Sequence, residues 1–197
     1  MRMNVVDSQL LLENIEKNIM GCDKCPRLRD VTPIPYPHIY YGKSLKIMVI
    51  GRNPGLEHDY KGVSSEEFMK VYKERFLISR VGQYLLEHLG EKIVMNSLFF
   101  CNVCKCSSPN NEKLMPSEKE RCYEFLEQQV KTIKPKIIIT LGTDAKDALE
   151  ENCVDHKYDG IPVFNMYHPS YFAYISKDDP KRKRQDLLLS SIREKFS

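Results

Sequence analysis

Four short apolar segments, separated by stretches with helical spacing, constrain the fold of this chain more than any other feature. They read LKIMVIG at 45–51, SLFFCNV at 97–103, KIIITLG at 136–142 and IPVFNMY at 161–167. Strands this uniformly apolar are typical of a parallel sheet that is covered on both faces. The sequence therefore predicts an α/β fold, a three-layer α/β/α sandwich with a central, mainly parallel four-stranded sheet.

Helices are predicted before, between and after these strands. Apolar residues recur at helical spacing over residues 8–20 and again from residue 116 onward, where Ser117 and Glu120 fit a capping box. Further helices are predicted over residues 66–74, 80–89, 143–150 and 180–195. The segment 22–44 is rich in proline and tyrosine, which excludes regular helix. Because no repeat or linker interrupts the chain, we expect a single domain over residues 1–197.

Composition narrows the class of protein without indicating a function. The 197 residues are 42% hydrophobic and 29% charged, as in an ordinary globular protein, and no apolar run reaches the length of a membrane span. The N-terminus lacks the pattern of a signal peptide, so we expect a cytoplasmic protein with no membrane partner, acting as a monomer. The net charge of +3 is too small to predict nucleic-acid binding by itself.

Polar residues follow the end of each predicted strand. The loop GRNPG leaves the first strand, Asn102 ends the second, Gly142 and Thr143 end the third, and YHPS at 167–170 follows the fourth. Open parallel sheets bind ligands at the carboxyl ends of their strands. Four loops that are distant in the sequence are therefore expected to converge on one crevice.

Paired cysteines indicate a metal site. Cys22 and Cys25 form a C-x2-C pair, which is a half-site for zinc or for an iron–sulfur cluster. Cys106 and Cys122 flank a polar loop that contains prolines, and Cys104 competes with Cys106 as a ligand. A site of four cysteines is favoured, but these residues alone do not choose between zinc and iron.

The other cysteines have a simpler interpretation. Cys101 lies inside an apolar strand and Cys153 follows a helix, so each is better explained as a small core residue than as a ligand. Cys122 lies on the apolar stripe of its predicted helix, and packing in the core is an alternative for it as well.

Taken together, these segments resemble the iron–sulfur uracil-DNA glycosylases, especially family 4. The resemblance rests on GCDKCP, GRNPGLEHDYKG, NVCKCSSPNN with its later cysteine, and YHPSYF, in the family's order from about Gly21 to Gln185. It implies a monofunctional DNA repair glycosylase that hydrolyses the N-glycosidic bond of a flipped deaminated base, with uracil first, and leaves an abasic site. The resemblance also implies a structural 4Fe–4S cluster and therefore favours iron over zinc. The ligands of this cluster fall on Cys22, Cys25, Cys106 and Cys122.

Two residues of this resemblance carry base chemistry. Asn102 falls on the family's base-recognising asparagine. The chemistry fits this role, because a carboxamide can accept from N3–H of uracil and donate to O4. His168 falls on the histidine of the HPS loop, which donates to O2 of the leaving base. Without the family, Asn102 would be interpreted as a turn cap and His168 as an ordinary loop residue.

The loop after the first strand departs from the family. Arg52 stands where the family has an acid. The pattern G-x-NPG resembles instead the mismatch-specific and single-strand-selective glycosylases of the same superfamily, in which an asparagine positions the attacking water. Asn53 is therefore the first catalytic candidate, and His58 and Asp59 rank below it as groups that orient or deprotonate the water.

Further expectations concern the flipped base and the DNA. The base is expected to lie against Phe76 and against the loop residues Gly51, Pro54 and Gly55. Tyr171, Phe172 and Tyr174 are expected to enter the duplex, although an aromatic cluster is more often core. The basic run KRKR is expected to meet phosphates, although a solvated helix face is its alternative; its residues are Lys181, Arg182, Lys183 and Arg184.

Other functions remain open at this stage. Mismatched thymine and hypoxanthine are alternatives to uracil as the base. A non-catalytic iron–sulfur protein that binds damaged or single-stranded DNA is the main alternative from another class, and Arg52 favours it. A zinc-stabilised binding module ranks third and is separable by colour, because an iron–sulfur protein is brown.

Overall fold

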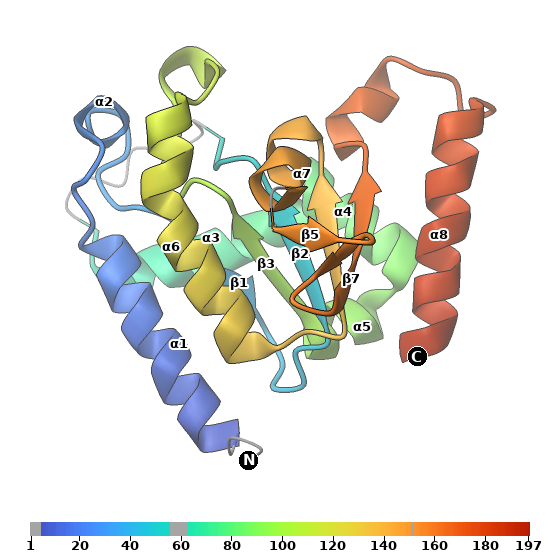
Figure 1. Cartoon of the computed structure of the whole chain (residues 1–197), viewed down its shortest axis with the longest axis horizontal. Helices are drawn as coiled ribbons and strands as arrows, with labels where there is room; N and C mark the ends of the chain where they lie inside the picture. The colour runs from blue at the N-terminus through green and yellow to red at the C-terminus, as the bar shows by residue number, and fades with distance from the viewer. Residues whose placement is uncertain (1–4, 56–62, 151) are drawn as a thin grey trace.

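The computed structural model describes the backbone of residues 5–55, 63–150 and 152–197, and side chains from Ser8 onward. Four parallel strands form its centre, in the order β3-β2-β4-β7 (Figure 1). Their bounds are Ile47–Gly51 for β2, Leu98–Asn102 for β3, Ile137–Leu141 for β4 and Ile161–Met166 for β7. The four predicted strands and their parallel arrangement are thereby confirmed.

The predicted number of four strands is wrong, because the described residues form a sheet of seven. Three strands of two residues each pair antiparallel at the edges: β1 (Ile39–Tyr40), β6 (Lys157–Tyr158) and β5 (Cys153–Val154). A strand of two residues carries no measurable hydrophobic period, so only its neighbours in space reveal it.

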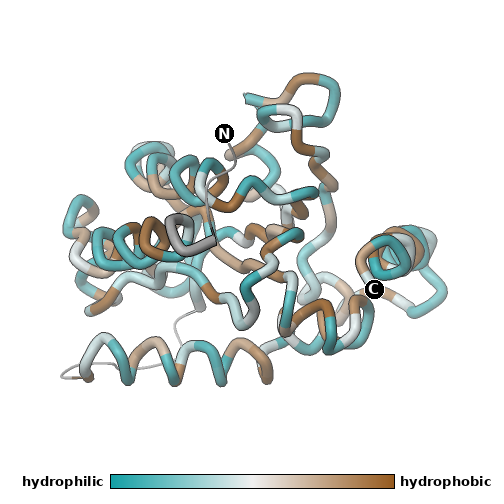
Figure 2. The backbone as a smooth tube through the Cα atoms, turned by 90° about the horizontal axis from the view of Figure 1, so that it is seen from below, coloured by the Kyte–Doolittle hydropathy of each residue, from teal (hydrophilic) through white to brown (hydrophobic). Residues whose placement is uncertain are grey.

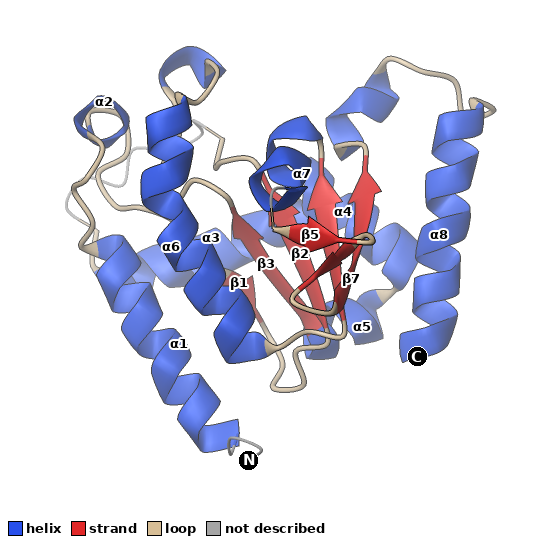
Figure 3. Ribbon diagram, in the orientation of Figure 1, coloured by secondary structure: helices blue, strands red, loops and turns tan. Residues whose placement is uncertain are grey.

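Helices cover both faces of the sheet and make the three layers (Figure 3). One face is covered by α1 (Val5–Met20), α6 (Pro116–Ile133) and α7 (Thr143–Glu150). The other face is covered by α3 (Ser65–Ile78), α4 (Arg80–Leu89), α5 (Glu91–Ser97) and α8 (Pro180–Phe196). Hydrophobic and polar residues alternate along these helices, as expected for elements with one buried side (Figure 2).

Alternate residues of the central strands enter two separate cores. Val49, Phe100 and Ile139 belong to the core under α4 and α8. Their neighbours Ile50 and Cys101 belong to the core under α1 and α6. Side chains alternate along a strand, so the last residue of β3, Asn102, lies on the same face as Phe100.

Two local expectations need correction. The segment 22–44 contains a short helix, α2 (Pro26–Arg29), with proline at its first turn, a position that tolerates it. The N-cap of α6 is Met115, two residues before the predicted cap Ser117, because Glu118 rather than Glu120 accepts a hydrogen bond from the cap backbone, at Met115 N, over 2.8 Å. By contrast, α8 begins at residue 180 as predicted, and Asp179 caps it by accepting from Lys181 N at 2.8 Å.

None of the helices in the described ranges combines the length and apolar character that a membrane span requires.

Candidate active site

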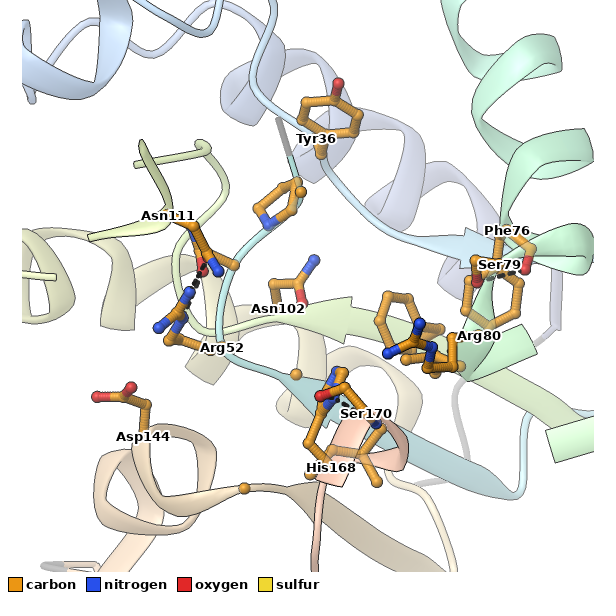
Figure 4. Close-up of a pocket in the computed structure, with 18 of the residues that line it drawn as sticks. Tyr36, Arg52, Phe76, Ser79, Arg80, Asn102, Asn111, Asp144, His168 and Ser170 are labelled. Carbon is orange, nitrogen blue, oxygen red and sulfur yellow. Dashed lines mark hydrogen bonds between the residues drawn. The ribbon is translucent and has the colours of Figure 1, made fainter. Parts of the chain in front are cut away.

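The carboxyl ends of the parallel strands open into one pocket of about 590 Å³. Loops after all four strands line it, and α3 and the start of α4 close its other side (Figure 4). The convergence predicted from the sequence is therefore confirmed. The lining includes Gly51, Arg52, Asn53, Pro54, Gly55, Phe76, Asn102, Gly142, Thr143 and His168.

Asn102 lies at the centre of this pocket, where β3 ends (Figure 4). It pairs in register with Gly51 on β2 and is only 4% exposed. A Cβ atom at position 51 would lie 2.5 Å from Oδ1 of Asn102. Glycine at position 51 therefore leaves the space that the Asn102 carboxamide occupies.

His168 faces the pocket from the loop after β7. Its Nδ1 accepts a hydrogen bond from Ser170 N at 3.2 Å and lies 2.7 Å from Ser170 Oγ. Burial lowers the pKa of His168, and the charges of Arg52 and Arg80 lower it further. The ring is therefore neutral at pH 7, and because Nδ1 is an acceptor, its proton is on Nε2.

Four aromatic residues line the pocket, Tyr36, Tyr72, Phe76 and Phe100, and the two phenylalanines pack against each other. Their ring centroids are 4.6 Å apart with an interplanar angle of 36°. Phe76 lies in the last turn of α3, next to Ser79, the N-cap of α4. Ser79 Oγ accepts from Gly82 N at 3.1 Å and donates to Phe76 O at 2.7 Å. This cap fixes the turn between α3 and α4, and with it the position of the Phe76 ring.

A network of hydrogen bonds holds the loop after β2. Arg52 Nε donates to Asn53 Oδ1 at 2.6 Å, and Arg52 Nη2 donates to Asn111 Oδ1. Asn53 Nδ2 donates to Ser108 Oγ at 3.3 Å. Both partners, Ser108 and Asn111, lie on the segment that follows β3. His58 and Asp59, the lower-ranked catalytic candidates, lie outside the described residues.

Three of the four predicted metal ligands share one small buried cluster. Cys25, Cys106 and Cys122 are each 5–6% exposed and pack together. Cys22 is partly buried and near enough for its charge to influence the Cys106 thiol. Cys104 also belongs to this cluster and is fully buried. The structure thus brings three of the four predicted ligands together and adds Cys104, while Cys22 lies outside this cluster.

Hydrogen bonds and burial act oppositely on these thiols. Burial raises the pKa of Cys25, and burial followed by the charge of Cys122 raises the pKa of Cys106 to about 12. Contact with Cys104, followed by the amide and charge of Lys105, lowers the pKa of Cys122, while the Cys104 thiol donates to Glu118 O at 3.5 Å. A bound metal would hold all its sulfur ligands as thiolates, because a coordinating thiol is deprotonated.

The donor set fits an iron–sulfur cluster better than a single ion. Within the described ranges, no group of three or more His, Cys, Asp or Glu side chains is arranged to hold one metal ion. A four-iron cluster gives each cysteine a separate iron, so its ligands surround a volume instead of converging on a point. The four buried thiols of this group are donors of the kind that such a cluster takes.

Ion pairs tie the N-terminal segment to this region independently of any metal. Arg27, two residues after Cys25, donates to both carboxylate oxygens of Glu118 at 2.9 and 2.8 Å. This bidentate pair holds the pKa of Glu118 below its usual range. Glu118 also caps α6, the helix that carries Cys122. The sequence analysis missed this link, because nothing in a linear pattern pairs residues 91 positions apart.

The aromatic residues after His168 divide between core and surface. Phe172 is 7% exposed, and its ring lies 5.6 Å from that of Tyr84 in the core. Tyr171 stacks on Tyr167 with ring centroids 5.0 Å apart. Tyr174 is 83% exposed. Of the expected wedge residues, Phe172 is therefore a packing residue, and solvent reaches Tyr174 most freely.

The basic run lies on the first turns of α8. Lys181, Lys183 and Arg184 are exposed, whereas Arg182 is partly buried with its guanidinium 5.5 Å from the ring centroid of Phe172. Lys181 Nζ lies 3.4 Å from Tyr171 Oη. Lys181 thus lies beside the stacked rings of Tyr167 and Tyr171 in the loop that carries His168.

Lys105 is the functional candidate that the sequence analysis overlooked. It is 1% exposed, and its ammonium donates to Asn102 O at 2.5 Å and to Gln129 Oε1 at 2.8 Å. No carboxylate among the described residues forms an ion pair with it. Its position between Cys104 and Cys106 was the available signal, but a lysine in a loop is ordinarily exposed.

Fold and site together define a class of protein. A parallel α/β/α sandwich that presents a carboxamide, a neutral imidazole and an aromatic wall in one pocket is suited to bind a planar, hydrogen-bonding ring such as a nucleobase. The family model described as the uracil DNA glycosylase superfamily matches residues 38–189. The chain belongs to that superfamily.

Individual relatives agree with this placement. A type-4 uracil-DNA glycosylase of Thermotoga maritima is 28% identical over 187 residues, covering 87% of this chain and 88% of the relative. One of Saccharolobus solfataricus is 32% identical over 203 residues, covering 94% of this chain and 87% of the relative. A third, of Sulfurisphaera tokodaii, is 28% identical over 198 residues, covering 88% and 84%.

Proposed function

We propose that this chain is a uracil-DNA glycosylase that hydrolyses the N-glycosidic bond of a flipped uracil and leaves an abasic site. The observation that carries the proposal is the meeting of Asn102 and His168 in one pocket, with Gly51 leaving room for the carboxamide. The relatives named type-4 uracil-DNA glycosylases support the same activity.

Base recognition is assigned to Asn102. Its side chain offers one acceptor and two donors, which match N3–H and O4 of uracil. Cytosine presents an acceptor at N3 and a donor at N4, so the same orientation would leave both partners unsatisfied. A buried polar mismatch of this kind gives strong discrimination. Phe76, packed against Phe100, supplies a face on which the base stacks.

Departure of the base is assigned to His168. As the bond breaks, negative charge builds on uracil, and a donor already aimed at it stabilises the transition state. The neutral ring can donate from Nε2 because Ser170 fixes Nδ1 as the acceptor. A donor held in place before the reaction costs no reorganisation when the charge appears.

Water positioning is assigned to Asn53. A carboxamide does not take up a proton at neutral pH, so its contribution is to hold water in line with C1′ of the sugar. Pro54 and Gly55 line the pocket beside it, where the sugar must approach. Ser107 Oγ donates to Gly55 O at 3.1 Å, which fixes this end of the loop.

The iron–sulfur cluster is assigned to Cys22, Cys25, Cys106 and Cys122, and when bound it supplies a structural crosslink and no redox step. Lys105 supports this assignment. A buried ammonium without a carboxylate partner is costly, and ionised sulfur ligands provide the negative charge that such a cation needs. The cluster would tie the N-terminal segment to the rest of a single domain.

DNA contact is assigned to the side of the pocket that carries Tyr171, Tyr174 and the exposed cations of α8. Tyr174 is the ring best placed to enter the duplex, while Lys181, Lys183 and Arg184 meet phosphates. A DNA repair activity agrees with the expected cytoplasmic location, and we propose that the protein acts as a monomer.

One assay tests the function. Purified protein is incubated with oligonucleotides that carry a single uracil, a thymine opposite guanine, hypoxanthine or xanthine, and alkali then reveals abasic sites. We expect cleavage at uracil, which is lost in the Asn102→Ala variant. Cleavage only at one of the other bases would show that this base, and not uracil, is the substrate. Binding of all substrates without cleavage would favour the non-catalytic alternative.

A further inference from the structure

We propose that Arg52 is a positioning residue, which orients the carboxamide of Asn53 and is itself held by Asn111. This inference rests on the proposed glycosylase function. It concerns the position at which this chain departs from the acid of the related enzymes, and it gives the replacement a role other than proton transfer.

The contacts of Arg52 determine which way the Asn53 carboxamide points. Arg52 can only donate hydrogen bonds, so the atom 2.6 Å from its Nε must be the oxygen of Asn53. On the other side, Ser108 donates its own proton to Glu112 O at 2.8 Å. Ser108 Oγ is therefore free to accept from Asn53 Nδ2. The two neighbours thus agree on one orientation of the amide.

This orientation leaves Oδ1 of Asn53 suited to hold water. A carbonyl oxygen has two acceptor sites, and Arg52 uses one of them. The remaining site can accept from a water molecule in the pocket, which Asn53 lines. A charge-assisted hydrogen bond from a guanidinium makes this oxygen less basic. The same contact therefore favours holding the water over removing its proton.

The loop that carries two of the cluster cysteines holds Arg52 in turn. Asn111 accepts from Arg52 Nη2, and Cys104 N donates to Arg52 O at 3.0 Å. Asn111 has a left-handed backbone, with φ of 57°, a conformation that asparagine tolerates better than most residues. The position of the loop after β2 is therefore set by residues 104–111, the segment that also carries Cys104 and Cys106.

Asn110 provides a matched control for Asn111. The two asparagines are adjacent and exposed, and both have positive φ, 50° and 57°. Replacing either with alanine imposes the same kind of backbone cost. Only Asn111 contacts Arg52. A difference between the two variants therefore reports the contact and not the strain of the turn.

Single-turnover cleavage of uracil DNA is measured for Arg52→Gln, Asn111→Ala, Asn110→Ala and Asn53→Ala, and for Arg52→Gln combined with Asn53→Ala. We expect Arg52→Gln to lower the rate by about 100-fold, the scale of a misplaced reactant, with unchanged affinity for DNA. Asn111→Ala should lower it by about 10-fold and Asn110→Ala by less than about 2-fold. The double variant should be no slower than Asn53→Ala alone, because Arg52 acts through Asn53.

A second measurement separates this proposal from the glycosylase function. The side-chain amide signals of Asn53 are followed by NMR in protein labelled on asparagine, and Asn53→Ala assigns them. We expect Arg52→Gln to shift these signals without DNA, and Arg80→Gln, which removes a charge from the same pocket, to leave them in place. If wild-type protein cleaves no base, the proposed glycosylase function is wrong. The amide signals of Asn53 still test the contact between Arg52 and Asn53 in that case.

Two results would overturn the role of Arg52. Additive losses in the double variant would mean that Arg52 acts independently of Asn53. Weaker DNA binding in Arg52→Gln with an unchanged cleavage rate at saturation would mean that the guanidinium contacts a phosphate.

Discussion

The ammonium of Lys105 lies 2.5 Å from the main-chain oxygen of Asn102 and is almost completely buried. One side chain thus connects the end of β3 with the loop of Cys104 and Cys106. It also donates to Gln129 on α6 at 2.8 Å. A buried cation at this position links the cysteine cluster to the pocket by electrostatics and by hydrogen bonds.

Replacing Lys105 with methionine should destabilise the protein and weaken its hold on iron. The variant leaves Asn102 O and Gln129 Oε1 without their donor, at a cost of about 2–4 kcal/mol in the free energy of unfolding. Iron per chain and urea unfolding measure the effect. Lys131→Met, on the exposed face of α6, the helix that carries Gln129, is the control and should cost less than about 1 kcal/mol. Equal stability and iron content in the two variants would refute the link.

Serine variants should distinguish Cys106 from Cys104 as a cluster ligand. We expect Cys106→Ser to lose iron and visible absorption, because a ligand is removed. Cys104→Ser should retain both, because a hydroxyl can still donate to Glu118 O, the acceptor of the Cys104 thiol. Cys101→Ser, in the core away from the cluster, controls for packing loss. Iron retained in Cys106→Ser but lost in Cys104→Ser would transfer the ligand role to Cys104.

Replacing His168 with alanine should lower the cleavage step by about 100- to 1000-fold, the usual loss of one charge-stabilising donor. Binding of uracil DNA should survive better than turnover. An unchanged single-turnover rate would remove His168 from the mechanism.

The dependence of cleavage on pH should report the neutral state of His168. Burial, Arg52 and Arg80 all lower its pKa, so the ring is neutral at pH 7 and the rate should not change from there upward on account of His168. Below the lowered pKa, protonation of Nδ1 opposes the Ser170 N–H donor and the rate should fall. In Arg80→Gln the pKa of His168 rises, so the decline should begin at higher pH; Asp144, which also lines the pocket, remains in both proteins. A decline unmoved by this change would contradict the assignment.

His38 should make the folded state sensitive to acid. It is fully buried, its Nε2 has no hydrogen-bond partner among the described residues, and burial lowers its pKa to about 3. Because the ring is neutral, its 3.7 Å approach to Glu16 is not an ion pair. The unfolded chain binds a proton near pH 6.5 that the folded chain rejects, so stability falls as the pH decreases from 6.5 toward 3.

Urea unfolding at pH 7.5 and pH 5.0 measures this contribution. Between these values the wild type should lose about 2 kcal/mol more than His38→Phe, whose ring can stack on Phe99 without titrating. Parallel losses in the two proteins would show that other groups cause the sensitivity.

The sequence by itself determined the layers of the fold and the location of the site. Four apolar strands, each followed by polar residues, can be recognised in the sequence without knowledge of tertiary contacts. Burial on both faces leaves an uninterrupted hydrophobic run in each of them. The placement of Gly51, Asn102 and His168 at strand ends then follows from parallel topology. The cap at Asp179 was equally predictable, since a helix start depends on a few adjacent residues.

Only the tertiary structure decided what each of these residues contacts. The edge strands, the Arg27–Glu118 pair and the burial of Lys105 join segments far apart in the chain, and no local pattern encodes them. Phe172 and Tyr174 are both aromatic and two residues apart, yet one is in the core and the other is exposed. The partner of Arg52 was likewise undetermined, because hydrogen bonds depend on distance and direction in space, which a linear sequence does not give.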